Sequence, residues 1–247
     1  MGGNQQEMLR NIQIGSLVLS LGYIFSFFLT VFGSRTLGDL VLLIFVCLSC
    51  VLVAREWVKA PLILISGSLI GFIAEYIGLR LGAPFGSYTY NAFRAARVLG
   101  VPIPIILAWG IYLYTCYLAS ATLVKERWKR ILVASLLMVN LDLAVDPVMV
   151  KLGLWSWSQQ GPWFGVPLSN YAGWFIVSLL SLLVYAMFSG REPEKVSIIA
   201  YIPYLSTYTQ LFYLAELEVL PAVTVSFLVS IIPLTLISTK KGLNRNL

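Results

Sequence analysis

The sequence predicts an all-α fold: a polytopic integral membrane helical bundle of about eight transmembrane helices, forming a single domain over residues 1–247. Of these residues 59% are hydrophobic and only 11% are charged, and the mean hydropathy is +0.85. That composition leaves too little polar surface for a soluble globule. Apolar runs near the length of about 20 residues that crosses a bilayer recur along the chain. Short segments with glycine, proline and charge separate them.

The first four expected spans cover residues 12–32, 39–54, 61–78 and 101–124. The first run lacks a small-residue cleavage site and is followed by more spans, so we expect a transmembrane helix rather than a signal peptide. The loops GSRTLG and REWVK bound the second span. A long loop rich in glycine and aromatic residues separates the third span from the fourth.

The last four expected spans cover residues 131–150, 168–188, 196–214 and 219–238. KERWKR precedes the first of these, and a second long aromatic loop follows it. GREPEK separates the sixth span from the seventh. Such short charged connectors are typical of loops between packed spanning helices.

The distribution of positive charge predicts the orientation of the chain. Most of the 17 Lys and Arg residues lie near the two termini and in REWVK, KERWKR and GREPEK, all on one side of the expected bundle. Lysine and arginine mark the cytoplasmic side. We therefore expect a multi-pass protein of the cell membrane with both termini cytoplasmic and the lipid bilayer as its surroundings. This placement also accounts for the net charge of +6, so no nucleic-acid partner is predicted.

The chain contains no histidine, and this absence excludes several classes of enzyme and cofactor site. Iron-dependent membrane oxygenases, haem or zinc sites held by histidine, and a Ser-His-Asp triad all require that residue. Every lysine lies at a helix end or in a loop, so a Schiff base deep in a span is not expected. Carboxylates, tyrosine and arginine remain for acid and base work.

Three carboxylates fall inside apolar spans, where ionisable groups are costly and usually functional. Glu75 lies late in the third span, and VNLDLAVDPV places Asp142 and Asp146 late in the fifth. A spacing of four residues puts both aspartates on one helix face, about 6 Å apart along the axis. Because both helices run outward from a cytoplasmic start, we expect all three carboxylates in the outer half of the membrane.

Aromatic residues gather on that same outer side. The two long loops are LRLGAPFGSYTYNAFRAARVLGVP and KLGLWSWSQQGPWFGVPLSN. An interfacial aromatic belt would place such residues on both sides of the membrane, whereas the opposite loops contain few. In the seventh span Tyr201, Tyr204 and Tyr208 recur at helical spacing, a stripe that is usually packing and could also line an apolar channel.

A weak internal repeat connects the two aromatic loops. Gly100-Val101-Pro102 followed by Trp109 recurs as Gly165-Val166-Pro167 followed by Trp174, at an offset of 65 residues. Each copy opens a helix that runs inward. We expect the third and fourth spans, and the fifth and sixth, to form two related hairpins with the site between them.

Several motifs in one order, from about residue 73 to residue 174, carry a family resemblance. They are E-Y-I-G, G-A-P-F-G-S-Y-x-Y, G-V-P, D-L-A-V-D-P, W-S-W and G-x-P-L-S-N-Y-x-G-W. This motif-bearing core resembles the CruF-type membrane carotenoid hydratases, the family of bisanhydrobacterioruberin hydratase and γ-carotene 1′-hydroxylase. The resemblance implies addition of water across the terminal C1=C2 bond of an acyclic carotenoid, with water and a lycopene- or bisanhydrobacterioruberin-like substrate as partners and with no cofactor or metal.

Hydration of such an alkene requires a proton for C2, a tolerated cation at C1 and a water molecule for that cation. A buried carboxylic acid can donate the proton, and a second carboxylate can activate the water. Aromatic faces can stabilise the cation. We assign catalytic roles to Glu75, Asp142 and Asp146 without separating acid from base. The expected substrate- and water-binding residues are Arg80, Tyr88, Tyr90, Trp109, Asn140, Trp155, Trp157, Asn170, Trp174, Tyr204 and Tyr208.

Three alternatives stay open on the sequence alone. A lycopene-type cyclase starts with the same protonation and ends by ring closure. An intramembrane prenyltransferase would need a second aspartate-rich motif, and a small-solute transporter would place polar groups along the full membrane depth. The sequence also leaves the oligomeric state open, a homo-oligomer included.

Overall fold

The computed structural model describes residues 2–91, 95–194 and 196–243. Within them, six helices are long and apolar enough to cross a membrane, which confirms the first six expected spans and marks a membrane protein. They are α1 (Gly2–Phe32, apolar from Arg10), α2 (Arg35–Ala54), α3 (Pro61–Leu81), α4 (Ile103–Leu123), α5 (Arg127–Lys151) and α6 (Leu168–Phe188).

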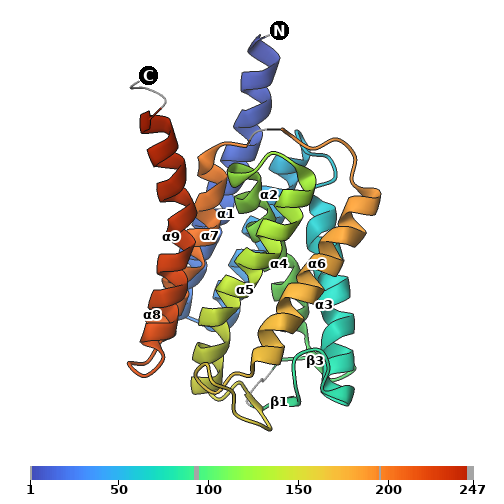
Figure 1. Ribbon diagram of the computed structural model, residues 1–247, viewed down its shortest axis with the longest axis vertical. Helices are drawn as coiled ribbons and strands as arrows, with labels where there is room; N and C mark the ends of the chain where they lie inside the picture. The colour runs from blue at the N-terminus through green and yellow to red at the C-terminus, as the bar shows by residue number, and fades with distance from the viewer. Residues whose placement is uncertain (1, 92–94, 195, 244–247) are drawn as a thin grey trace.

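The seventh expected span is broken rather than continuous. It consists of a 3₁₀-helix η1 (Ile198–Tyr201), α7 (Ile202–Ser206) and α8 (Tyr208–Leu214). Pro203 lies in the first turn of α7, where a missing backbone N–H is tolerated, so a new helix begins there. The last expected span corresponds to α9 (Leu220–Leu243). The broken segment and α9 run side by side along one flank of the bundle (Figure 1).

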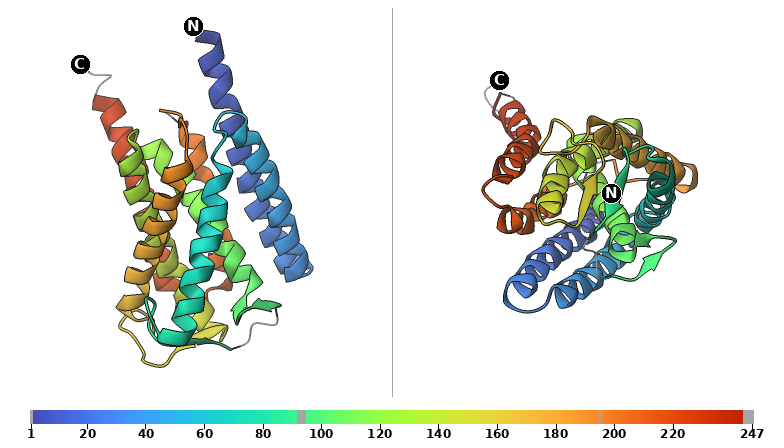
Figure 2. Two further views of the ribbon diagram at one scale, coloured as in Figure 1. Left: turned by 90° about the vertical axis from the view of Figure 1, so that its right-hand side faces the viewer. Right: turned by 90° about the horizontal axis from the view of Figure 1, so that it is seen from below.

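The bundle has two different ends. The chain starts and finishes at one end, here called the terminal end, and the short strands lie at the opposite end, here called the strand end (Figure 1). Helices α3 to α6 pack against one another in the middle, and α1 leans on η1, α7 and α8. α2 packs almost wholly on α1, and the α1–α2 hairpin stands apart from α4 toward the strand end (Figure 2).

The strand end is closed by the two aromatic loops. β1 (Tyr88–Tyr90) pairs antiparallel with β4 (Trp155–Trp157), so that Tyr88 lies opposite Trp157 and Tyr90 opposite Trp155. β2 (Arg97–Val98) and β3 (Val101–Pro102) form a tight hairpin before α4. The two loops that the sequence places on one side of the bundle are therefore hydrogen-bonded to each other.

The internal repeat extends to the backbone. α4 and α6 each contain 21 residues and begin directly after Pro102 and Pro167. Before each proline stands a left-handed pair, Leu99-Gly100 (φ 50° and 96°) and Phe164-Gly165 (φ 51° and 86°). Glycine accommodates such φ values without steric cost. The second helices of the two hairpins thus share length and the geometry of the preceding turn, which supports the predicted repeat.

Candidate active site

The acid cluster, defined as Glu75, Asp142 and Asp146, lies inside the bundle toward the strand end. Glu75 stands on α3, and the two aspartates stand on α5. These side chains are 6%, 0% and 3% exposed. α3 and α5 both pack on α6, so the two helices that carry the cluster face a common neighbour. The structure therefore brings the three predicted carboxylates to the same half of the molecule; their catalytic roles stay predictions.

Three donors surround the Glu75 carboxylate. The Tyr88 hydroxyl donates to Oε2 in a short hydrogen bond, the Tyr90 hydroxyl donates to Oε2 at 2.7 Å, and Trp109 Nε1 donates to Oε1 at 3.0 Å. Residues two apart on a strand point to the same face, which is how β1 aims both tyrosines at one carboxylate. Pairing of β1 with β4 holds that register.

The two tyrosines remain donors over a wide pH range. Both lie in β1, outside the spanning helices. Burial, and next the negative charge of Glu75, raise the pKa of Tyr88 and of Tyr90 above the ordinary tyrosine value. Each hydroxyl therefore stays protonated at physiological pH and donates a hydrogen bond to the Glu75 carboxylate.

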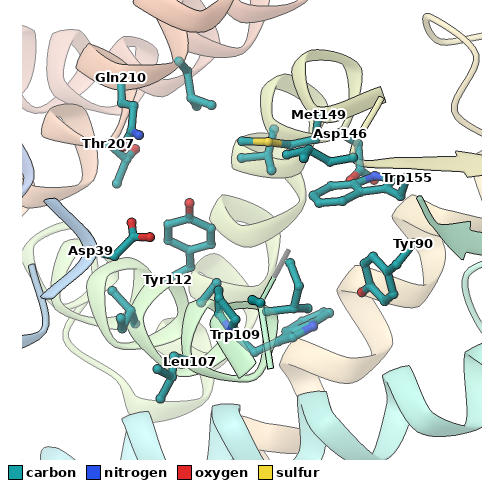
Figure 3. A pocket seen from close by; sticks show the side chains of 18 of the residues that line it. Asp39, Tyr90, Leu107, Trp109, Tyr112, Asp146, Met149, Trp155, Thr207 and Gln210 are labelled. Carbon is teal, nitrogen blue, oxygen red and sulfur yellow. The ribbon is translucent and has the colours of Figure 1, made fainter. Parts of the chain in front are cut away.

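Asn170 connects the two aspartates. Its Nδ2 donates to Asp142 Oδ2 at 2.7 Å and to Asp146 Oδ2 at 2.5 Å. The asparagine stands in the first turn of α6 and is 2% exposed. The four-residue spacing on α5 places both carboxylates within reach of one amide. Asp146 also lies beside the indole of Trp155 (Figure 3).

A cavity of about 630 Å³ begins at the acid cluster and extends toward α2 and α8. Glu75 and Asp146 contribute to its lining, whereas Asp142 is fully buried behind Asp146. Most of the wall is apolar. Trp109 and Trp174, the equivalent tryptophans of the repeat, stack in it with ring centroids 4.3 Å apart. Trp155, Trp157, Tyr88 and Tyr90 line it at the strand end.

The contacts between equivalent residues indicate how the hairpins are related. Trp109 stacks on Trp174, and β1 pairs antiparallel with β4. Contacts of one element with its own counterpart are what a twofold relation between the two hairpins produces. The predicted location of the site, between the hairpins, agrees with the cavity that these contacts border.

Arg80, expected among the substrate- and water-binding residues, does not line the cavity. Its guanidinium carbon lies 3.7 Å from the centre of the Tyr76 ring, and its Nη1 donates to the Tyr76 carbonyl at 3.4 Å. The side chain is exposed. At the last turn of α3 an arginine can reach the membrane surface, where its charge is better solvated than in an apolar cavity.

Asn140, Tyr204 and Tyr208 form a separate polar cluster instead of lining the cavity. Asn140 Nδ2 donates to the Tyr204 hydroxyl at 2.9 Å, to the Tyr208 hydroxyl at 3.1 Å and to the Ser226 carbonyl at 3.0 Å. The three side chains are buried. They join α5 to α7, α8 and α9, so this part of the predicted site is a packing contact between helices.

Among the polar cavity residues that the sequence analysis missed are these four: Asp39 on α2, Tyr112 on α4, Thr207 between α7 and α8, and Gln210 on α8. We call them the Asp39 cluster. Figure 3 shows them together on one side of the cavity, with Asp146, Trp155 and Tyr90 on the other. In the sequence Asp39 lies at the boundary of an expected span, where charged residues are common and do not indicate a functional site. The remaining three follow no motif.

Among the residues that the structure describes, no group of three or more His, Cys, Asp or Glu side chains is arranged to hold a metal ion. The donors around the acid cluster are hydroxyl, indole and amide groups. These groups suit a carboxylate that accepts hydrogen bonds or exchanges protons.

Together, the apolar helices, the buried carboxylates and the aromatic wall define a membrane protein with a largely apolar cavity that reaches two buried carboxylates. The family described as "Carotenoid biosynthesis protein" matches residues 35–237, and the chain therefore belongs to that family. A bisanhydrobacterioruberin hydratase of Haloarcula japonica is 29% identical over 132 residues, which are 51% of this chain and 45% of the relative. The match thus spans less than half of that relative. No solved structure matches the chain.

Proposed function

We propose that this protein hydrates the terminal C1=C2 double bond of an acyclic carotenoid end group to give a tertiary alcohol. The observation that carries the proposal is the apolar cavity that ends at Glu75 and Asp146. A polyene terminus can occupy such a cavity with its last double bond beside the carboxylates. Membership of the carotenoid biosynthesis family and the similarity to a protein named as a hydratase support the same reaction.

Asp146 is the proton donor in this proposal. Asp142 and Asp146 each accept from the same amide nitrogen, so their carboxyl groups lie close together in a dry environment. Two such groups cannot both ionise and therefore share a proton. Of the pair, Asp146 lines the cavity and delivers this proton to C2. Asp142, behind it, and Asn170, which also lines the cavity, act as positioning residues.

The aromatic wall stabilises the cation that forms at C1. Protonation of C2 breaks the π bond and leaves a tertiary carbenium centre. The stacked Trp109 and Trp174 and the nearby Trp155 present indole faces to the cavity. A desolvated cation over an indole gains about 2 kcal/mol, and uncharged rings are poorer nucleophiles than carboxylates.

Glu75 accepts the second proton. Water attacks C1 and forms the C–O bond, and its surplus proton passes to the Glu75 carboxylate. Tyr88, Tyr90 and Trp109 hold that carboxylate in place. One proton leaves Asp146 and one arrives at Glu75, so transfer between these two cavity residues resets the site. The reaction consumes one water and no net proton.

The membrane orientation belongs to the proposal. With both termini cytoplasmic in the cell membrane, the strand end and the acid cluster lie toward the outer leaflet. The substrate then enters from the hydrocarbon of the bilayer, and its reacting end reaches the cavity at the depth of the acid cluster.

Pigment analysis tests the proposed reaction. The gene is expressed in a lycopene-producing bacterium. The extracted carotenoids are separated by chromatography, and their molecular masses are determined by mass spectrometry. Hydration adds the mass of one water molecule for each end that reacts, whereas ring closure leaves the mass unchanged. We expect the hydrated product with the wild-type chain and its loss with Asp146→Asn. Unaltered lycopene, or a cyclised product of equal mass, contradicts the proposal.

A further inference from the structure

We propose that the Asp39 cluster is the inlet through which water enters the cavity. It stands on the opposite side of the cavity from Asp146 (Figure 3). The inference rests on the proposed hydration, because a reaction that consumes water in every cycle needs a supply of it. It adds a function for residues on α2, α4 and α8 that the mechanism above does not use.

The Asp39 cluster lies where the cavity meets the outside of the molecule. Arg35 and Thr36, in the first turn of α2, line the cavity and are exposed, and Asp39 one turn later is exposed as well. This turn follows the α1–α2 connection, toward the strand end, where the α1–α2 hairpin stands apart from α4 (Figure 2). Charged side chains at such a helix end sit at the interface between lipid and water.

The acid side of the cavity is enclosed by comparison. Glu75 and Asp146 are almost fully buried. The β1–β4 pair lies next to them, and Trp157 Nε1 donates to the Phe85 carbonyl at 2.9 Å, which fixes the indole at that end. Water that arrives from the Asp39 side therefore crosses the cavity to reach the reacting carbon.

The chemistry of the Asp39 cluster favours water over a hydrocarbon. A carboxylate, a phenol, a hydroxyl and an amide face the cavity from three helices and a helix junction. The hydrocarbon of a carotenoid chain offers them no hydrogen bond, whereas a water molecule can donate to the carboxylate and accept from the phenol and the amide. A water molecule in a cavity needs two to four polar partners, and this cluster supplies them.

Water supply and proton delivery can be separated chemically. If the cation at C1 meets no water, it loses a proton from C2 or from a C1 methyl group to Glu75, and an alkene forms again. The membranes are first equilibrated in deuterated water until the donor carries deuterium, so a carotenoid recovered after protonation and elimination contains deuterium without added oxygen. Hydration therefore reports on both water supply and protonation, whereas deuterium delivered by the pre-labelled donor in its first turnover reports on protonation alone.

The test measures both quantities in deuterated water with membranes that contain the full-length protein and lycopene. Tyr112→Phe removes one oxygen atom, and the double variant Asp39→Leu with Gln210→Leu removes two polar groups. We expect hydration to fall about tenfold in each, the equivalent of roughly one net hydrogen bond, while deuterium exchange into recovered lycopene persists. If the double variant does not fold, Tyr112→Phe alone is sufficient to test the proposal.

Matched controls come from the same region of the chain. Tyr213→Phe and Thr209→Val alter exposed residues of α8 that do not line the cavity, and both should hydrate at the wild-type rate. Wild-type rates of hydration in the variants of the Asp39 cluster would contradict the proposed inlet. So would an equal loss of hydration and exchange, because that places the cluster in protonation or substrate binding. A wild-type chain that gives neither hydration nor exchange refutes the proposed function itself, and the inlet falls with it.

Discussion

At the scale of single residues, burial makes each polar group of the site consequential. Glu75 is held by three donors, and the two aspartates share one amide. In water such contacts are worth little, whereas inside a low-dielectric bundle an unmatched carboxylate is costly. The buried carboxylates of the acid cluster therefore lie where the proposed reaction needs one proton delivered and another removed.

Removal of the acid function should abolish hydration without loss of the fold. We expect Glu75→Gln and Asp146→Asn each to lower turnover by about 10²- to 10⁴-fold, the range for loss of general acid or base catalysis. Membrane insertion and detergent-solubilised yield should stay at wild-type levels, because the amides keep the size of the acids. Glu216→Gln, at an exposed glutamate that pairs with Lys151 at 3.5 Å, serves as the control. Undiminished conversion by both site variants would refute the assignment.

Two buried asparagines should separate stability from activity. Asn170 bridges the aspartates, and Asn140 bonds Tyr204 and Tyr208 away from the cavity. We expect Asn170→Ala to suppress hydration. Asn140→Ala should instead lower the free energy of unfolding by about 1–3 kcal/mol, since its partners are left unsatisfied. Thermal unfolding in detergent and pigment conversion, measured on both variants, check this; the reverse pattern would contradict the placement.

At the scale of elements, the terminal end is held by a buried ionic network that the site does not use. Glu192, in the loop after α6, pairs with Arg127 at 3.1 Å and with Arg130 at 3.3 Å. Tyr117 on α4 and Tyr185 on α6 also donate to it, at 3.1 Å and 3.0 Å. One carboxylate thus ties α4, α5 and α6 together at the end opposite the acid cluster.

Loss of that carboxylate should destabilise the bundle. Glu192→Gln leaves Arg130, whose side chain is 1% exposed, without a full counter-charge, and breaking a buried pair costs about 3–5 kcal/mol. We expect a lower midpoint of thermal unfolding and a similar product pattern in the protein that remains folded. Glu194→Gln, two residues along the same loop and exposed, should change the midpoint little. Equal effects of the two substitutions would show that the network contributes nothing particular.

At the scale of the whole molecule, the sequence predicts the features of a single helix better than the contacts between two helices. Hydropathy located the six long spans, and the spacing of Asp142 and Asp146 set their common face. The pairing of Asn140 with Tyr204, or the placement of Asp39 and Gln210 on one side of the cavity, depends on which faces of distant helices meet. No periodicity within a single helix records that choice. The break at Pro203 was likewise missed, because an apolar run looks the same whether the helix is continuous or interrupted.

The orientation of the molecule gives the last prediction, because the positive charges and the proposed site lie at opposite ends. Loops at the terminal end carry most of the lysine and arginine, and such loops stay cytoplasmic. With Cys47, Cys50 and Cys116 replaced by serine, single cysteines are introduced as Asn91→Cys at the strand end and Lys125→Cys at the terminal end, both exposed positions. A membrane-impermeant thiol reagent should label the first in intact cells and the second only after lysis. The opposite pattern would place the acid cluster on the cytoplasmic side, where the carotenoid end that it protonates would have to lie in the inner leaflet.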